Sequence, residues 1–309
     1  MIDLSAWPAL ILSAGVATRL RPLSNVRAKA ALPVAGQPLI SRILRWLSNA
    51  GVRQAVINLH HRAETVTRIV GDGADWDVSV RYSWETTVLG SAGGPSRALP
   101  LLDAERFLIV NGDTLTDCDL RAVAEQHVDT GALVTMALVE KTDVERLAFV
   151  DDSDVIRRFG VRGDGGGFFG LHFIGVQAVE AAAFAAVPDD QPYEAVKQLY
   201  PRLITAHPGS VRAFRSSAEF LDVGTAADYL ATVETVAARE GRGLDVGANG
   251  HIDASATIEH SILWDRVRVG PRARLTDCIV ADDVMIPADS DYKRCAIVNS
   301  DTGVVVATF

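Results

Sequence analysis

The chain has 309 residues, of which 48% are hydrophobic and 22% charged, a composition typical of a globular protein. Its formal net charge of −9 disfavours nucleic acid as a partner, because most of the surface would repel a polyanion. No apolar run reaches the ~18 residues of a membrane span, and the first eight residues lack the basic start and apolar core of a signal peptide. We therefore expect a cytoplasmic protein with no membrane contact, long enough for one large domain and a smaller one.

The first predicted element is a buried strand over residues 9–12, and it ends in a turn of small residues that includes Gly15. Four cations follow within the next 14 residues: Arg19, Arg21, Arg27 and Lys29. Residues 4–63 contain eight Lys or Arg and no Asp or Glu, although the whole chain is acidic. A small-residue turn with fixed cations is suited to phosphate groups, so the pattern indicates a small anion in one basic pocket. An ordinary strand-to-loop junction with solvated arginines is the alternative at this point.

The spacing excludes two common phosphate loops. Ala17 and Leu20 stand where a dinucleotide fingerprint needs its second and third glycines. A P-loop that starts at Gly15 needs Gly-Lys after four residues, where this chain has Leu20-Arg21. The turn is therefore a third kind of phosphate turn.

The segment Gly15-x-x-Thr18-Arg19-Leu20-x-Pro22-Leu23, followed by Lys29 and residues 32–40, resembles the signature of the sugar-1-phosphate nucleotidyltransferases. Two positions depart from it, because many members have Gly at Ala17 and Pro at Ala30. The resemblance implies an enzyme that joins a nucleoside triphosphate to a sugar-1-phosphate, giving an NDP-sugar and pyrophosphate. It implies catalytic roles for Arg19 and Lys29, and nucleotide contacts at Leu12, Ala14, Gly15 and Thr18.

Strands and helices alternate through the next hundred residues. The expected strands are 54–59, 78–82 and 106–110, and the expected helices are 39–50, 63–70 and 93–101. This alternation predicts a Rossmann-like α/β fold, with a mostly parallel sheet that binds its ligand at the carboxyl ends of the strands. From residue 131 to 175 the pattern becomes β-rich, which predicts an antiparallel insertion on the sugar side.

Two aspartates are candidate site residues. Asp113 comes after the apolar strand 106–110, where a carboxylate would face the same crevice as Gly15, although the turn taken alone favours a capping role. Asp222 lies in an Asp-x-Gly-Thr context, and the capping box formed by Thr225 and Asp228 does not need it. The resemblance assigns metal-binding aspartates to both contexts, so it implies that Asp113 and Asp222 bind Mg²⁺.

Further substrate contacts come from the resemblance alone. The glycine-rich stretch 88–94 is similar to the family loop that packs against the nucleotide base, which implies contacts at Gly90, Ser91 and Gly93. The sugar-phosphate site falls on Gly170 and Lys197. The family glutamate that usually precedes this lysine is Val196 here, and Glu194 is a candidate replacement.

A 17-residue period appears in the C-terminal segment. Similar apolar-led motifs begin at Ile252, Val269 and Ile286, and the same register joins Asp265, Asp282 and Asn299. This period predicts a left-handed β-helix of about three coils in which Cys278 and Cys295 stack as core residues. With no Cys-x-x-Cys pair, we expect neither a zinc site nor a disulfide framework. We therefore expect a catalytic domain over 1–243 and a β-helix domain over 244–309; in the family such a tail usually mediates oligomerisation or regulation, so we expect a homo-oligomer.

The glycine loop and the tail lean toward a mannose-1-phosphate guanylyltransferase. Uridylyl or thymidylyl transfer to a glucose- or amino-sugar-1-phosphate is the alternative, and neither the base nor the sugar can be read from the residues. A non-catalytic subunit that senses NDP-sugars is the rival from another class. It would be expected to lose the charged site residues, whereas all of them are present here: Arg19, Lys29, Asp113, Lys197 and Asp222.

Overall fold

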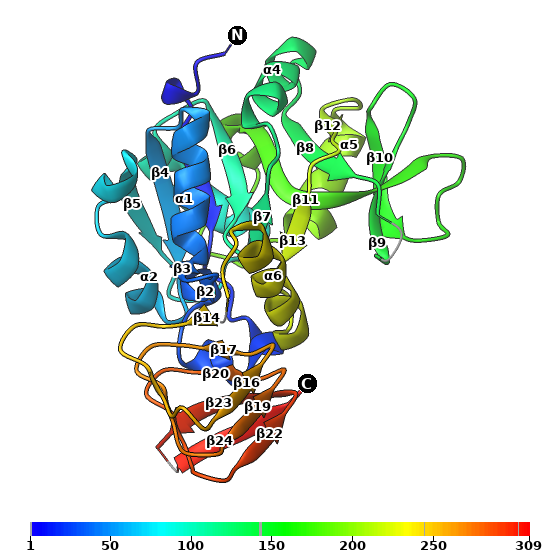
Figure 1. The fold of residues 1–309 in the computed structure, drawn as a ribbon. Helices are drawn as coiled ribbons and strands as arrows, with labels where there is room; N and C mark the ends of the chain where they lie inside the picture. Colours follow the sequence, from blue (N-terminus) through cyan, green and yellow to red (C-terminus); the bar gives the residue numbers. More distant parts are fainter. Residues whose placement is uncertain (1, 142–143, 244, 302) are drawn as a thin grey trace. The chain divides into compact units, whose positions relative to one another are not determined.

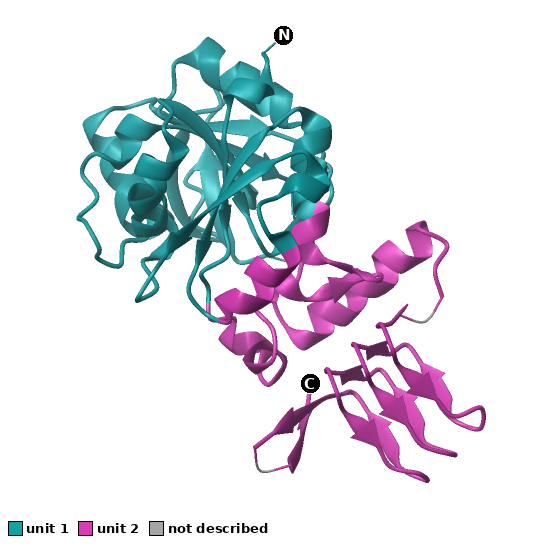
Figure 2. Ribbon diagram, turned by 90° about the vertical axis from the view of Figure 1, so that its left-hand side faces the viewer, with its two compact units in different colours: residues 1–15, 43–61, 70–220 teal, residues 16–42, 62–69, 221–309 magenta. Residues whose placement is uncertain are grey.

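The computed structural model describes residues 2–141, 144–243, 245–301 and 303–309. The chain divides into two compact units, coloured separately in Figure 2. Unit 1 comprises residues 1–15, 43–61 and 70–220, and unit 2 comprises residues 16–42, 62–69 and 221–309. Residue 244, where we place the start of the β-helix domain, lies outside the described residues, so the boundary stays a prediction.

Unit 1 contains the predicted parallel sheet, with β1 (Ala9–Leu12) between β4 (Gln54–Leu59) and β6 (Arg106–Asn111). Both neighbours run parallel to β1, and β5 (Ser79–Trp84) continues the sheet beyond β4 (Figure 1). Most residues of β1, β4 and β6 are buried, as near-continuous apolar runs predict for parallel strands. The helix α3 (Gly90–Leu102) packs against β1, β4 and β5. The expected alternation is therefore confirmed.

The antiparallel insertion is also confirmed. The long strand β11 (Phe169–Glu180) pairs antiparallel with β6, β8 (Val134–Val139) and β9 (Arg146–Val150). Strand β10 (Ile156–Val161) lies outside β9, and β12 (Val211–Arg215) runs parallel to β8. Unit 1 also contains η1 (Leu4–Ala6), η5 (Ala74–Trp76), β7 (Thr114–Thr116), α4 (Leu120–Thr130), η6 (Ala181–Phe184), η7 (Ala195–Leu199) and α5 (Tyr200–Ala206).

A titratable group lies in the core where α4 packs on β8 and β11. His127 is fully buried, and its Nδ1 lies 2.9 Å from the hydroxyl oxygen of Thr135. Burial lowers the pKa of His127 from 6.5 to about 4. The imidazole is therefore neutral in the folded protein at neutral pH.

This buried histidine predicts a pH-dependent stability. Between pH 6.5 and about 4 the unfolded chain protonates His127 while the folded protein does not, so the free energy of unfolding falls as the pH is lowered through this window. The contribution amounts to about 3 kcal/mol. Urea titrations at pH 7 and pH 4 measure the fall in the free energy of unfolding between the two pH values. This fall should be smaller in His127→Gln than in the wild type by the same amount. Parallel losses in the two proteins would contradict the assignment.

Unit 2 combines the signature segment with C-terminal elements. The segment forms three 3₁₀ turns and a small hairpin: η2 (Thr18–Leu20), η3 (Leu23–Asn25), η4 (Lys29–Ala31), β2 (Pro33–Val34) and β3 (Gln37–Pro38). Strand β13 (Phe220–Asp222) precedes α6 (Ala226–Arg239), and the predicted Thr225–Asp228 capping box is present. The helices α1 (Leu39–Ala50) and α2 (Ala63–Val70) each contain a boundary between the units.

The C-terminal segment of unit 2 is a parallel β-helix whose short strands stack in three rows. The rows are β14 (Asp245–Val246), β17 (Ile262–Leu263), β20 (Ile279–Val280) and β23 (Cys295–Ser300); β15 (His251–Ile252), β18 (Arg268–Val269) and β21 (Met285–Ile286); and β16 (Thr257–Glu259), β19 (Arg274–Thr276) and β22 (Asp291–Lys293). Partners are 17 residues apart, and the Sγ atoms of Cys278 and Cys295 lie 3.7 Å apart in its core, as the period predicts. A final strand, β24 (Gly303–Thr308), pairs antiparallel with β23.

The corners of the β-helix repeat the same backbone conformation in each coil, which fixes how the coils stack. Asn249, Arg266 and Asp283, each 17 residues apart, all have a left-handed backbone with φ between 57° and 62°. Asn and Asp tolerate this conformation better than most residues. At the same corner the guanidinium of Arg266 donates two hydrogen bonds to Asp283, at 2.6 and 2.8 Å. Among the described residues, no helix combines the length and apolar character needed to cross a bilayer.

Candidate active site

In unit 1 the predicted phosphate turn lies beside the turn that carries Asp113. Leu12, the last residue of β1, is in register with Asn111, the last residue of β6, and the Gly112 amide donates to the Leu12 carbonyl at 2.9 Å. A Cβ atom on Gly112 would lie 2.3 Å from the Ser13 hydroxyl oxygen, so this contact requires glycine. The prediction that the two turns share one edge of the sheet is confirmed.

A buried polar network, which the sequence did not indicate, supports this edge. Asn58 at the end of β4 accepts a hydrogen bond from the Ser13 amide at 2.7 Å and donates to Glu85 at 2.7 Å. The other carboxylate oxygen of Glu85 accepts from the Leu89 amide at 2.8 Å. Asn58 and Glu85 are 3% and 6% exposed. The network therefore connects the phosphate turn to Leu89, which lies in the glycine-rich stretch and directly precedes α3.

Close packing accounts for the glycine stretch within unit 1. A Cβ on Gly90 would lie 2.9 Å from the Tyr193 carbonyl, and one on Gly93 would lie 2.7 Å from the Gln191 carbonyl. The amides of Ala92 and Gly93 both donate to Tyr193. Instead of forming a separate loop, the stretch begins α3, and its base-binding role stays a prediction.

The segment packed against this helix carries two of the predicted sugar-phosphate residues. Ser91 donates to the Glu194 carboxylate at 2.7 Å and accepts from the Ala195 amide at 2.9 Å. The Glu194 carboxylate is thus hydrogen-bonded to a residue at the start of α3, while the Lys197 side chain is exposed on η7. The third residue, Gly170, is in register with Phe149, and a Cβ there would lie 2.8 Å from Leu147.

Lys197 lines a pocket of about 610 Å³ on the antiparallel insertion. The wall is largely apolar and includes Leu147, Phe159, Phe173 and Val196, the residue at the position of the family glutamate. Its charged and titratable lining residues, as far as the structure describes them, are Arg146, His172 and Lys197. The pocket therefore combines an apolar wall with basic groups.

Unit 2 brings together three of the predicted charged residues. The Lys29 ammonium lies 3.7 Å from the Asp222 carboxylate, and both side chains are partly exposed. A Cβ on Gly224 would lie 2.8 Å from the Asp222 carboxylate and 3.4 Å from the Arg19 guanidinium, so these groups converge at Gly224. Gly224 is therefore a further candidate site residue, which the sequence alone did not indicate. Ala17 adopts φ 51°, ψ 50°, so the turn has a left-handed backbone conformation that favours glycine at this position.

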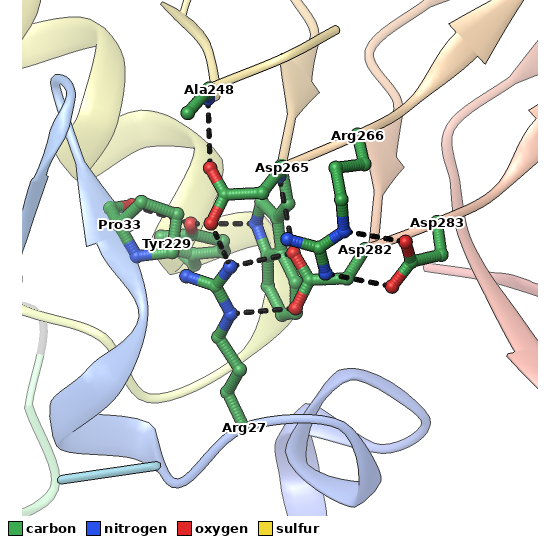
Figure 3. A network of polar contacts seen from close by, with 9 residues as sticks. Arg27, Pro33, Tyr229, Ala248, Asp265, Arg266, Asp282 and Asp283 are labelled. Carbon is green, nitrogen blue, oxygen red and sulfur yellow. Dashed lines mark hydrogen bonds and ion pairs between the residues drawn. The ribbon is translucent and has the colours of Figure 1, made fainter. Parts of the chain in front are cut away.

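One of the four predicted phosphate cations has another role. Arg27 donates to Asp282 through Nε at 2.8 Å and to Asp265 through Nη2 at 2.6 Å, and only 15% of its side chain is exposed (Figure 3). Burial acts to lower the pKa of Arg27, but the hydrogen bonds and charges of Asp282 and Asp265 raise it above its ordinary value. The prediction that Arg27 contributes to the phosphate pocket is therefore wrong, because carboxylates of the β-helix hold it.

The described residues include no cluster of three or more His, Cys, Asp or Glu side chains that could hold a metal. Mg²⁺ does not need one, since it is commonly bound by one or two carboxylates together with substrate phosphates and water. Asp222 has the required oxygen donors and is 38% exposed, beside Lys29. Asp113 is partly exposed at the edge of the sheet. The donor chemistry of both residues fits Mg²⁺.

Two family models match this chain. A nucleotidyl transferase model matches residues 8–159, which contain the phosphate turn and Asp113, and a GlmU-like C-terminal hexapeptide model matches residues 244–306. Residues 8–159 of this chain form a nucleotidyl transferase domain. The second match agrees with the stacked coils, so the C-terminal segment is a hexapeptide-type β-helix.

The curated relatives are sugar-1-phosphate nucleotidyltransferases. A UTP–glucose-1-phosphate uridylyltransferase from Synechocystis is 26% identical over 284 residues, 85% of this chain and 72% of the relative. A mannose-1-phosphate guanylyltransferase from Mycobacterium tuberculosis is 23% identical and covers 93% of this chain and 83% of the relative. An N-acetylmuramate α-1-phosphate uridylyltransferase from Neisseria meningitidis is 44% identical over 115 residues, which span 37% of this chain and 50% of that protein.

A solved structure shows the same fold. HddC from Yersinia pseudotuberculosis superposes with a TM-score of 0.64 at 23% identity, covering 74% of this chain and 99% of HddC.

Proposed function

We propose that this protein catalyses attack of a sugar-1-phosphate oxygen on the α-phosphorus of a nucleoside triphosphate, giving an NDP-sugar and pyrophosphate. The observation that carries the proposal is the convergence of Arg19, Lys29 and Asp222 around Gly224. A protein that only senses NDP-sugars has no need to keep two cations and a carboxylate together in this way. The nucleotidyl transferase domain over residues 8–159 supports the proposal.

The main barrier is electrostatic, because two anionic phosphates must meet. Two unit charges of the same sign 4 Å apart repel by about 4 kcal/mol at an effective dielectric of 20. The attacking phosphate oxygen is already ionised, so no side chain has to act as a nucleophile or base. Charge neutralisation and alignment are sufficient.

Each site residue receives a role on this basis. Arg19 binds the β- and γ-phosphates and neutralises the pyrophosphate as it leaves, while Lys29 steadies the phosphoryl group that is transferred. Lys197 binds the phosphate of the sugar. Backbone amides near Ala14 and Gly15 complete the nucleotide contacts, with Leu12 and Thr18 on either side of them.

Asp113 and Asp222 are the proposed Mg²⁺ ligands. When bound, Mg²⁺ neutralises phosphate charge and orients the phosphate oxygens. The carboxylate of Asp222 also lies 3.7 Å from the Lys29 ammonium, so the attraction between the two charges holds this lysine at the site.

There are two candidate pairs of nucleotide base and sugar. Guanylyl transfer to mannose-1-phosphate is the first, supported by the relative that aligns with nearly the whole chain. Uridylyl transfer to an amino-sugar-1-phosphate is the second, favoured by the 44% identical uridylyltransferase and by the apolar pocket wall at Val196. An apolar wall suits a sugar with an apolar substituent, because sugar hydroxyls placed against it would lose hydrogen bonds.

A substrate matrix tests the proposal. The purified chain, with no partner protein, is incubated with Mg²⁺, each of four nucleoside triphosphates and a panel of sugar-1-phosphates, and pyrophosphate is measured. We expect pyrophosphate release that requires a sugar-1-phosphate, with GTP and mannose-1-phosphate or with UTP and an amino-sugar-1-phosphate. No release in any combination would favour a non-catalytic subunit.

A further inference from the structure

The segment around Lys29 is held at both ends by side chains from distant parts of unit 2. On the N-terminal side, Arg27 bridges Asp265 and Asp282, which occupy the same position in successive coils of the β-helix. On the C-terminal side, the Pro33 carbonyl accepts a hydrogen bond from the Tyr229 hydroxyl at 2.5 Å (Figure 3). Lys29 therefore lies between two fixed points.

The two fixed points belong to one network. The Trp264 indole donates to the Tyr229 hydroxyl at 3.1 Å, and the Arg27 guanidinium lies 5.2 Å from the centre of the Trp264 ring, within the range of a cation–π contact. Both aromatic side chains are fully buried. A change at Arg27 would therefore reach Tyr229 through Trp264.

The aspartates are themselves positioned by the stacking of the coils. Asp265 accepts from the Ala248 amide at 2.8 Å, and Asp282 accepts from the Asp265 amide at 3.1 Å, each across one 17-residue turn (Figure 3). Backbone donors of the β-helix thus orient both carboxylates independently of Arg27. This arrangement makes the β-helix a rigid receptor for the guanidinium.

We infer that Arg27 is a positioning residue through which the β-helix fixes Lys29 for phosphate binding. The role of Lys29 rests on the proposed function, whereas the clamp is formed by contacts within unit 2. The tail then has a function inside each chain, in addition to any part in self-association. The 3₁₀ turn that begins at Lys29 is closed by two short-range backbone hydrogen bonds, from Ala31 to Ala28 and from Leu32 to Lys29, and the amide of its N-cap Ala28 also donates to the Thr65 hydroxyl at 3.0 Å. So short a turn depends on contacts with its flanking residues to stay in place.

Two kinds of measurement test the inference. Hydrogen exchange at the amides of Ala31 and Leu32, which close this turn, should become at least about tenfold faster in Arg27→Ala, because the clamp is lost at one end. In steady-state kinetics the same variant should lose about 100-fold in kcat/KM for the nucleoside triphosphate while KM for the sugar-1-phosphate is unchanged. Arg27→Lys should give intermediate values, because it keeps the charge but cannot reach both carboxylates as a planar fork.

Arg266→Ala is the matched control, since Arg266 makes an equally bidentate pair with Asp283 at the neighbouring exposed corner, and its guanidinium, as far as the structure describes it, donates to this carboxylate of the β-helix and not to the signature segment. It should leave both measurements at wild-type values. If Arg27→Ala does not fold, Asp282→Asn, which keeps the Asp265 contact, should raise exchange in the same direction by a smaller factor. Unchanged exchange in a folded Arg27 or Asp282 variant, or equal changes in Arg266→Ala, would overturn the inference. The exchange measurement needs no substrate, so it decides the clamp even if the wild type shows no pyrophosphate release.

Discussion

Replacing Asp222 by Asn is expected to lower kcat by about 1,000-fold, and Asp113→Asn should have a similar effect, while both proteins stay folded. Asn keeps the shape of the side chain but removes the negative charge that binds Mg²⁺. At Asp222 it also removes the charge that faces the Lys29 ammonium at 3.7 Å. Steady-state turnover at saturating substrate, with circular dichroism to verify folding, measures the effect.

The matched control is Asp152→Asn, at an exposed aspartate in the turn between β9 and β10. It makes the same chemical change outside the site and should leave kcat within a factor of two or so of the wild type. Raising the Mg²⁺ concentration should recover part of the activity of the site variants, because a site with lower affinity for Mg²⁺ is occupied at a higher Mg²⁺ concentration. Near-normal kcat in Asp113→Asn or Asp222→Asn would remove that residue from the metal assignment.

The second large effect is expected at Asn58, in the buried network of unit 1. Asn58→Ala leaves the Glu85 carboxylate without its amide partner and the Ser13 amide without its acceptor. Because both groups are buried, the free energy of unfolding should fall by about 3 kcal/mol or more. Urea denaturation at pH 7 measures this loss directly.

The same substitution should weaken nucleotide binding, since the network connects the phosphate turn to Leu89. We expect KM for the nucleoside triphosphate to rise at least about tenfold in the fraction that remains folded. Asn299→Ala removes a single hydrogen bond from an exposed asparagine, to the Asp283 carbonyl, and should cost about 1 kcal/mol or less. If Asn58→Ala were no more destabilising than this control, the network would not be what supports the edge of the sheet.

The parts of the fold that follow a period were predictable from the sequence. Helix α2 occupies residues 63–70 as expected, and the 17-residue period places the thiols of Cys278 and Cys295 in contact. Both results depend on near-neighbour rules, namely the spacing of apolar residues along a helix and the stacking of equal positions in successive coils. Strand β24 breaks the period, so its antiparallel pairing could not be foreseen from the repeat.

The position of a candidate site residue was predictable where the residue follows a strand. It was not predictable where the residue binds a partner that is distant in the sequence. The edge formed by Leu12 and Asp113 follows from parallel strands, because their carboxyl ends meet. Arg27 has the same charge as Arg19 and Lys29, and nothing local separates it from them. Its partners, Asp265 and Asp282, lie more than 200 residues away, and only the folded β-helix brings them to it.

The role of the glycines in residues 88–94 also could not be inferred from the local sequence. The short spacing of Gly90, Gly93 and Gly94 indicated a ligand loop, yet in unit 1 each of them allows close packing against Tyr193, Gln191 or the Asn58–Glu85 network. A sequence states that a small residue is required at such a position. Whether a ligand or a neighbouring segment of the chain fills the space depends on tertiary packing.

Transfer of labelled oxygen tests the central claim most directly. A sugar-1-phosphate with oxygen-18 in its phosphate group is incubated with the purified chain, Mg²⁺ and the nucleoside triphosphate that supports turnover, and the products are analysed by mass spectrometry. Attack by the sugar phosphate on the α-phosphorus predicts an NDP-sugar that retains all of the label and unlabelled pyrophosphate. Label in the pyrophosphate, or the absence of an NDP-sugar with every nucleotide and sugar-1-phosphate tried, would contradict the account.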